Sequence, residues 1–234
     1  DLQQETPVWY QCVLGAGLSG VNNKPWREQF LAMNPGFARI ALESDAYTAL
    51  LAAHGGQAGV MVAAGTGSIA EALYADGTRR QVGGWGFPVG DEGSGAWMGL
   101  RAMAHAQQAV DGRAPGGALA DRVLQQCGGS RQTLQQWCAV ARQYDYAQLA
   151  RTVFDCAHSD TVAENLLRDA AAALESMATA LDPQAVLPLA IYGSVGRSLM
   201  PRLAPATRDR CIPTPRDAAY GALTLVQQLL EETP

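Results

Sequence analysis

Residues 60–101 read VMVAAGTGSIAEALYADGTRRQVGGWGFPVGDEGSGAWMGLR and contain two glycine-rich loops. The first loop, residues 64–68, follows a continuous apolar run that is typical of a buried strand. The second, residues 83–95, holds six glycines and Pro88 and leads into a helical pattern. Glycine lets the backbone approach a ligand closely and turn its N–H groups toward it. Strand, glycine-rich loop and helix in this order predict an α/β fold that holds a small polar ligand between the two loops.

The composition is that of a globular protein with a substantial core, because 48% of the residues are hydrophobic and only 17% are charged. A chain of 234 residues can form one large domain or two modest ones. The net charge is −5 and no basic run is present. This argues against nucleic acid as a partner, since its phosphates require clustered Lys and Arg. The net negative charge does not exclude small anionic ligands, because backbone N–H groups and helix N-termini can bind them.

The five cysteines are scattered and lack a Cys-x-x-Cys pair, which predicts reduced thiols in a cytoplasmic protein. The three histidines are isolated, so no metal-ligating residues are predicted from their spacing. No apolar run approaches the roughly 20 residues that a membrane-spanning helix needs. Residues 1–7 are polar and do not resemble a signal peptide. We therefore expect a cytoplasmic protein with no membrane partner.

Apolar periodicity and turn residues predict strands that alternate with helices. Strands are expected at residues 8–14, 38–42, 60–64, 69–74, 79–82, 187–192 and 210–213, and helices at 23–33, 46–54, 95–109, 118–127, 131–141, 146–156, 160–181, 197–203 and 217–231. The alternation at the start predicts a largely parallel sheet. A hairpin turn at residues 75–78 predicts a meander that belongs to a second unit. We expect two domains, 1–56 and 57–234, with the final helix packing back on the first.

Asp45 follows a predicted strand at the carboxyl edge of the sheet, where ligands of α/β proteins bind. Two interpretations are open for it. The side chain could be the N-cap of the helix at residues 46–54. It could instead be the general base that takes a proton from a substrate hydroxyl as the oxygen attacks phosphorus.

The glycine-rich loops carry further candidates, and each has a structural alternative. In the first loop, residues 64–68, the hydroxyls of Thr66 and Ser68 could add donors to a phosphate cradle. The alternative is that the segment is an ordinary hairpin turn. It is not a P-loop, because the signature Gly-Lys-Ser/Thr does not occur.

The second loop and the later turn carry the other candidates. Asp91 could cap the following helix, accept hydrogen bonds from sugar hydroxyls or hold a magnesium-bound water. Trp85 could be a packing anchor or a flat wall against a sugar ring. Residues 193–196 could form the floor for an adenosine or a plain strand-to-helix turn. Together these features favour a kinase.

Taken in order, the segments resemble the N-acetylglucosamine kinase and BadF/BadG/BcrA/BcrD ATPase family of the actin-like ATPase superfamily. The matching segments are Asp45-Ala46-Tyr47, Ala64-Gly65-Thr66-Gly67-Ser68, Gly83-Gly84-Trp85-Gly86, Gly90-Asp91-Glu92-Gly93-Ser94-Gly95, Gly193-Ser194-Val195 and Gly221-Ala222-Leu223. The resemblance spans nearly the whole chain. Its most specific part is the second glycine-rich loop, and the other segments support it by their order and spacing.

The resemblance implies a ribonuclease H-like, actin-like ATPase fold with two domains around a central cleft. It also implies transfer of phosphate from ATP, with Mg²⁺, to the 6-hydroxyl of N-acetylglucosamine or glucosamine, in a homodimer. By motif, Asp45 is the catalytic base. The residues implied at the sugar are Ser68, Gly84, Trp85, Gly86 and Asp91, and those implied at ATP are Gly65, Thr66, Gly67, Gly193 and Ser194.

The sequence departs from the family pattern at two places. Some members carry an asparagine after Gly-Thr-Gly-Ser that contacts the sugar, whereas this chain has Ile69. The family also opens with a strand and hairpin bearing Asp-Gly-Gly-Gly-Thr, which binds phosphates, and no such segment precedes Val8. Residues 15–20 instead resemble a later Leu-Ser-Gly turn near the sugar. We therefore expect the N-terminal domain to be incomplete here, and ATP turnover to require that missing loop.

Two other classes of function stay open. One is an ATPase that energises a partner enzyme, but such activators ligate an iron–sulfur cluster with cysteines at a dimer interface, and no paired cysteines suit one here. The other is a non-catalytic sugar-binding module that retains the sugar site without turnover.

Overall fold

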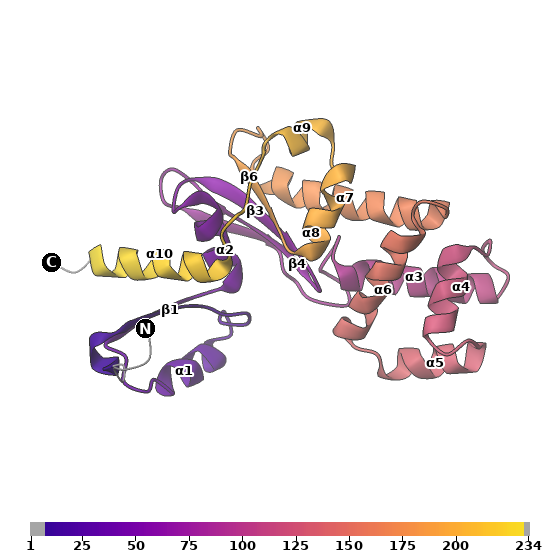
Figure 1. Cartoon of the computed structure of the whole chain (residues 1–234), viewed down its shortest axis with the longest axis horizontal. Helices are drawn as coiled ribbons and strands as arrows, with labels where there is room; N and C mark the ends of the chain where they lie inside the picture. The colour runs from indigo at the N-terminus through magenta and orange to yellow at the C-terminus, as the bar shows by residue number, and fades with distance from the viewer. Residues whose placement is uncertain (1–7, 232–234) are drawn as a thin grey trace, which may run out of the picture.

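The computed structural model describes residues 8–231, and the polar segment at residues 1–7, which does not resemble a signal peptide, lies outside this range. The described chain is elongated, with a small β-unit at one end, a mixed sheet in the middle and a group of helices at the other end (Figure 1). No helix within residues 8–231 is long and apolar enough to cross a membrane. The five cysteines are all free thiols.

The small unit is a two-stranded parallel sheet. Strand β1 (Val13–Gly17) pairs with β2 (Arg39–Glu43), and α1 (Lys24–Ala32) connects them. Asn23 caps α1, because its side chain accepts a hydrogen bond from the backbone N–H of Trp26 at 3.2 Å. The expected strand at 8–14 is wrong over its first part. Trp9–Gln11 form a 3₁₀ helix (η1), and Trp9 packs edge-on against Phe37 with ring centroids 4.9 Å apart.

The central sheet has five strands in the order β5-β4-β3-β6-β7. They are β3 (Gly59–Ala64), β4 (Ser68–Leu73), β5 (Arg79–Gly83), β6 (Leu189–Tyr192) and β7 (Cys211–Ile212). Strands β3, β4 and β5 are antiparallel neighbours, whereas β6 and β7 run parallel to β3. The antiparallel run of β3, β4 and β5 confirms the expected meander, because a short turn between two strands reverses the chain direction. The parallel pairing expected at the start of the chain is found between β1 and β2.

Strand β3 is buried on both faces, so its alternating side chains enter two different hydrophobic cores. Val60 and Val62 pack in the larger core with the helical group, whereas Met61 packs in the smaller core with Leu50 and Leu51. The smaller core includes α2 (Asp45–His54), which covers one face of the sheet. The other face is covered by α7 (Thr161–Leu181).

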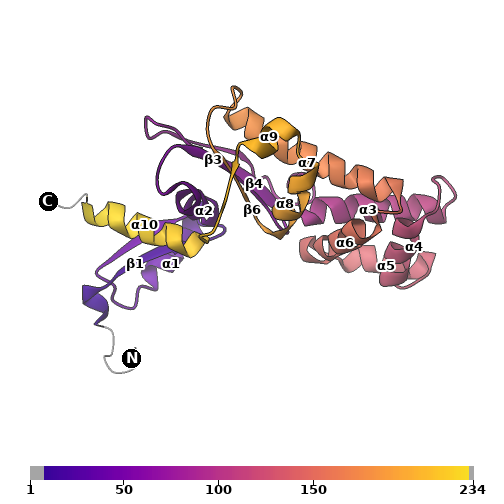
Figure 2. The ribbon, with the colours of Figure 1, turned by 45° about the horizontal axis from the view of Figure 1, so that its top comes forward.

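The helical group consists of consecutive helices. They are α3 (Gly95–Val110), α4 (Ala118–Gln126), α5 (Arg131–Val140) and α6 (Gln143–Cys156), followed by the long α7. Helix α3 packs along α6, and both pack on α7, as the two views of the ribbon show (Figures 1 and 2). After β6 come α8 (Ser194–Leu199), η2 (Met200–Arg202) and α9 (Pro205–Asp209). The expected helix at 197–203 thus begins three residues earlier, and α9 was not predicted.

The last helix, α10 (Ala218–Glu231), returns to the start of the chain. It packs against β1, β2 and α2, and the guanidinium of Arg39 donates a hydrogen bond to the carbonyl of Leu229 at 3.0 Å. Helix α2 therefore has the central sheet on one side and α10 on the other. The division into domains 1–56 and 57–234 stays a prediction, but α2 and α10 are the elements that tie the two regions together.

Candidate active site

A cavity of about 610 Å³ lies where the carboxyl ends of β1, β2 and β3 meet. Its size is within the range of small-molecule sites, and its position at strand ends is usual for α/β proteins. Both polar turns and glycine-rich loops contribute to its wall. The lining residues are Ser19, Gly20, Asn22, Ser44, Asp45, Ala63, Thr66, Gly67, Ser68, Ile69, Gln81, Gly84, Asp91 and Gln143.

Asp45 is the first residue of α2 and is exposed at the cavity, between the buried residues Ser44 and Ala46. The expectation that Asp45 caps the helix is wrong. The N-cap is Ser44, whose Oγ accepts a hydrogen bond from the backbone N–H of Tyr47 at 3.0 Å. The shorter serine side chain can fold back onto the helix end from the N-cap position. The Asp45 carboxylate, which accepts from the N–H of Ala46 at 3.0 Å, is left facing the cavity.

Asp91 faces the same cavity from the second glycine-rich loop and is buried. Its Oδ2 accepts a hydrogen bond from Nε2 of Gln143 at 2.7 Å, and its Oδ1 accepts from the backbone N–H of Ser68 at 3.4 Å. Burial raises the pKa of this carboxyl above its usual 3.8, and the hydrogen bond from Ser68 opposes the rise. The backbone of Asp91 is left-handed, with φ of 59°, a conformation that aspartate tolerates better than most residues. The structure thus brings Asp45 and Asp91 to one cavity.

The loop at residues 64–68 joins β3 to β4 and lines the same cavity with Thr66, Gly67 and Ser68. Gly65 and Thr66 accept hydrogen bonds through their carbonyls from the first two N–H groups of α3, at 2.8 and 3.2 Å. The Ser68 hydroxyl donates to the carbonyl of Glu92 at 2.7 Å. These bonds fix the two glycine-rich loops together, and the exposed Thr66 is left at the cavity.

Two features of the site were missed from the sequence. Gln143, the first residue of α6, holds Asp91 from 52 positions away, and no local pattern marks it. Beneath Ser44, the buried carboxylate of Glu71 accepts a hydrogen bond from the Ser44 hydroxyl at 3.4 Å and pairs with Arg79 at 3.8 Å. The Arg79 guanidinium also lies 3.2 Å from the centroid of the Tyr47 ring. This cluster supports the start of α2 from the side of β4 and β5.

Several expected site residues do not line this cavity. Trp85 is 86% exposed and contributes to a separate hollow against α7, beside Met177. Gly86 accepts a hydrogen bond from the N–H of Gly90 within the loop. Gly193 and Ser194 lie at the start of α8, where Gly193 packs against the carbonyl of Ala64 at the end of β3. Gly65 is also absent from the lining, although its neighbours Thr66 and Gly67 are present.

Comparison with known proteins decides the family, because residues 6–187, most of the chain, match the BadF/BadG/BcrA/BcrD ATPase family. The chain belongs to the BadF/BadG/BcrA/BcrD ATPase family. This confirms the resemblance found in the sequence. ATP use follows from membership of this ATPase family, as the glycine-rich loops indicated.

Three proteins that are similar to this chain are named as sugar kinases. The glucosamine kinase GspK of Vibrio cholerae is 34% identical over 211 residues, which are 90% of this chain and 71% of that protein. The N-acetyl-D-glucosamine kinase of Dictyostelium discoideum is 28% identical over 212 residues, covering 82% of this chain and 65% of that protein. A crystal structure of a candidate N-acetylglucosamine kinase from Chromobacterium violaceum is 46% identical and superposes with a TM-score of 0.91, covering 95% of this chain and 78% of that one. The expected α/β, actin-like ATPase fold is thereby confirmed.

The described part of this ATPase family chain, residues 8–231, holds no cluster of three or more His, Cys, Asp or Glu side chains that could bind a metal ion by themselves. Mg²⁺ that accompanies a nucleotide needs no such cluster, because it usually takes one or two carboxylates together with substrate phosphates and water.

Proposed function

We propose that this protein transfers the terminal phosphate of ATP to the 6-hydroxyl of an amino sugar, N-acetylglucosamine or glucosamine. The observation that carries the proposal is the shared cavity of about 610 Å³, which is lined by Asp45, Asp91 and the Thr66–Ser68 turn. The volume suits a hexosamine together with the end of a nucleotide. The sugar kinase names of the relatives support the same substrate class.

Asp45 is proposed as the general base. Its carboxylate is exposed to the cavity and is carried on the first turn of α2, whose packing on the central sheet fixes its position. Phosphoryl transfer needs mainly correct positioning of the attacking hydroxyl and stabilisation of charge. A carboxylate within hydrogen-bond reach of the 6-hydroxyl both orients that hydroxyl and accepts its proton.

Asp91, Ser68 and Gly84 are proposed to bind the sugar. Asp91 is held by Gln143 and by the backbone of Ser68, so its oxygens are fixed before a ligand arrives. A buried carboxylate with a fixed direction is a strong acceptor for sugar hydroxyls. The roles of Trp85 and Gly86 in binding the sugar stay predictions. In this conformation Trp85 lines the hollow beside α7. A contact between Trp85 and the sugar would require its loop to move.

Gly65, Thr66 and Gly67 are proposed to face the ATP phosphates, and Gly193 and Ser194 the adenosine. The carbonyls of Gly65 and Thr66 are already bonded to α3, which leaves the Thr66 hydroxyl as a donor on the cavity side. Mg²⁺ is proposed to accompany ATP, because Mg²⁺ usually binds together with substrate phosphates. When bound, it neutralises charge on the phosphates.

The test is a coupled assay of ADP release by the product of the full open reading frame. The acceptors are N-acetylglucosamine, glucosamine, glucose and no sugar. Release that depends on an amino sugar supports the proposal. Hydrolysis that is independent of sugar would instead indicate an ATPase activator, and sugar binding without ADP release would indicate a non-catalytic module.

The position of transfer is tested separately with 6-deoxy-N-acetylglucosamine. This analogue retains every other hydroxyl, so it should bind without being phosphorylated. In the product formed from N-acetylglucosamine, the ³¹P nucleus should couple to the protons on carbon 6. Turnover of the 6-deoxy sugar would rule out the 6-hydroxyl as the acceptor.

We also propose a homodimer that works in the cytoplasm. The exposed apolar side chains of Trp85 and Val89, which are 86% and 90% accessible, lie on one loop and suit a protein contact better than water. Light scattering of the full-length protein measures its mass in solution. A mass equal to one chain across the micromolar range would exclude the dimer.

A further inference from the structure

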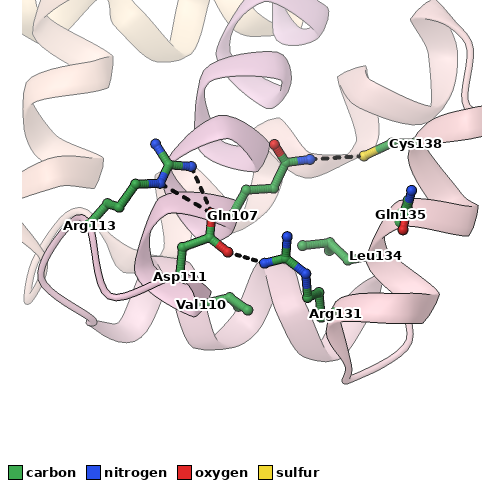
Figure 3. Close-up of a pocket in the computed structure, with 8 residues that line it drawn as sticks. All are labelled: Gln107, Val110, Asp111, Arg113, Arg131, Leu134, Gln135 and Cys138. Atoms are coloured by element: carbon green, nitrogen blue, oxygen red, sulfur yellow. Dashed lines mark hydrogen bonds and ion pairs between the residues drawn. The ribbon is translucent and has the colours of Figure 1, made fainter.

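A second cavity, of about 220 Å³, lies in the helical group between the end of α3 and α5 (Figure 3). Two arginines, Arg113 from the loop after α3 and Arg131 from the first turn of α5, approach the carboxylate of Asp111 from opposite sides. Above them the side-chain amide of Gln107 donates to the sulfur of Cys138 at 3.3 Å. Leu134 forms an apolar wall. None of these residues belongs to the proposed active site.

The charges in this cavity do not balance, because two guanidinium groups share one carboxylate. Arg113 uses Nε and Nη2 to bind one oxygen of Asp111, at 3.2 and 2.9 Å, and Arg131 uses Nη1 to bind the other. The two arginines hold the pKa of Asp111 below its usual 3.8, so it is ionised at neutral pH. Each guanidinium has five N–H donors in a fixed plane. Unused donors and a net positive charge therefore remain at the cavity.

The cavity is connected to Asp91 by two structural routes. Helix α3 runs from Asp111 back to its N-cap Ser94, whose backbone N–H donates to the carbonyl of Asp91 at 3.0 Å. Helix α5, which carries Arg131 and Cys138, is followed closely by Gln143, and Gln143 holds the Asp91 carboxylate at 2.7 Å. A shift of α5 relative to α3 would thus change the position of Gln143 against Asp91.

We propose that the cavity between α3 and α5 binds a small oxyanion, a carboxylate or a phosphate group, and that its occupancy adjusts the position of Gln143 against Asp91. Planar guanidinium groups match these two anions by paired hydrogen bonds. The cavity of about 220 Å³ is smaller than the roughly 300–1,000 Å³ of pockets for drug-sized molecules, so it suits a small ligand. A bound anion would bridge Arg113 and Arg131 and draw α5 toward the end of α3.

The first experiment measures binding. The Tm of the full-length protein is recorded in inorganic phosphate, in succinate and in sodium chloride of equal ionic strength. The comparison uses wild type, the double variant Arg113→Gln/Arg131→Gln, and the control Arg151→Gln, which removes an exposed arginine of α6. Exposed ion pairs contribute little stability, so both variants should fold, and their far-UV circular dichroism verifies this.

We expect at least one of the two anions to raise the Tm of wild type and of Arg151→Gln by about 2–4 °C over chloride. The double variant should lose most of this rise. Comparing phosphate with succinate distinguishes the two sources of the oxyanion. The absence of a Tm rise in wild type would overturn the proposed anion site. An equal rise in the double variant would also overturn it, because the effect would then come from an adventitious ion only or from the active site.

The second experiment measures the coupling without relying on kinase activity. The side-chain amide resonance of Gln143, identified by its absence in Gln143→Glu, is followed by NMR as the stabilising anion is added. It should shift with the anion in wild type but not in the double variant. The amide of Gln228, on α10 at the other end of the molecule, is the internal control. A stationary Gln143 resonance at saturating anion would overturn the coupling, whether or not the protein proves to be a sugar kinase.

Discussion

At the scale of single residues, Asp45 gives the sharpest prediction. Asp45→Asn keeps the size of the side chain but removes a proton acceptor, and general-base catalysis typically contributes 10²–10⁴-fold. We expect kcat to fall by about that factor while Tm changes little, because Asp45 is exposed and Ser44 caps the helix. The matched control is Asp155→Asn, which changes an exposed carboxylate on α6 in the same way. A near-wild-type kcat in Asp45→Asn would remove Asp45 from the role of base.

Glu71 gives a prediction about pH and stability. Burial raises the pKa of Glu71 above its usual 4.5, although Arg79 lowers it in part. The folded state therefore holds this proton more tightly than the unfolded state, so the contribution of Glu71 is favourable below pH 4.5 and is lost as pH rises through the raised pKa. Relative to Glu71→Gln, wild type should lose free energy of unfolding as the pH rises from about 4.5 toward neutrality.

Urea denaturation across this pH range measures the difference. Glu28→Gln, an exposed glutamate on α1, should run parallel to wild type. If Glu71→Gln also runs parallel, then Glu71 ionises in the folded protein as it does in the unfolded chain.

At the scale of elements, the turn between β3 and β4 is fixed by close packing. A Cβ added at Gly67 would lie 2.9 Å from Oδ2 of Asp91, so Gly67→Ala must displace the carboxylate or the turn. We expect KM for the amino sugar to rise about tenfold, equivalent to about 1.4 kcal/mol, with a smaller change in kcat. Gly116→Ala has open space around the added Cβ and should leave both constants unchanged. An unchanged KM in Gly67→Ala would show that Asp91 is not held where the sugar binds.

The elements also show how far the sequence determines the site. Apolar runs, and the glycines that interrupt them, predicted most strands and helices to within a few residues, because these signals are local. Asp45, Thr66, Ser68 and Asp91 were predicted because each sits in or beside a strand end or a glycine-rich loop. Gln143 was not, since its role depends on how α6 packs beside the second loop. For the same reason the pairing of Glu71 with Arg79 became visible only in the register of β4 and β5.

At the scale of the whole molecule, α10 joins the small β-unit to the rest of the chain through a tight contact with α2. A Cβ added at Gly221 would lie only 1.7 Å from the carbonyl oxygen of Thr48, which is backbone and cannot move aside cheaply. Gly221→Ala should therefore lower the free energy of unfolding by about 1–3 kcal/mol, the usual cost of overpacking. Leu223→Ala, an exposed position on the same helix, should change it much less.

The same substitution tests whether the cavity depends on this junction. The cavity takes Ser19 and Asn22 from the small unit and Asp45 from α2, so separating α10 from α2 should spread these walls. Gly221→Ala should then weaken amino-sugar binding, measured by calorimetry under conditions where circular dichroism shows the variant folded, whereas Leu223→Ala should bind as wild type does. Wild-type sugar affinity in a destabilised Gly221→Ala variant would mean that the cavity is formed by the central sheet and α2 without help from the small unit, and that α10 serves stability alone.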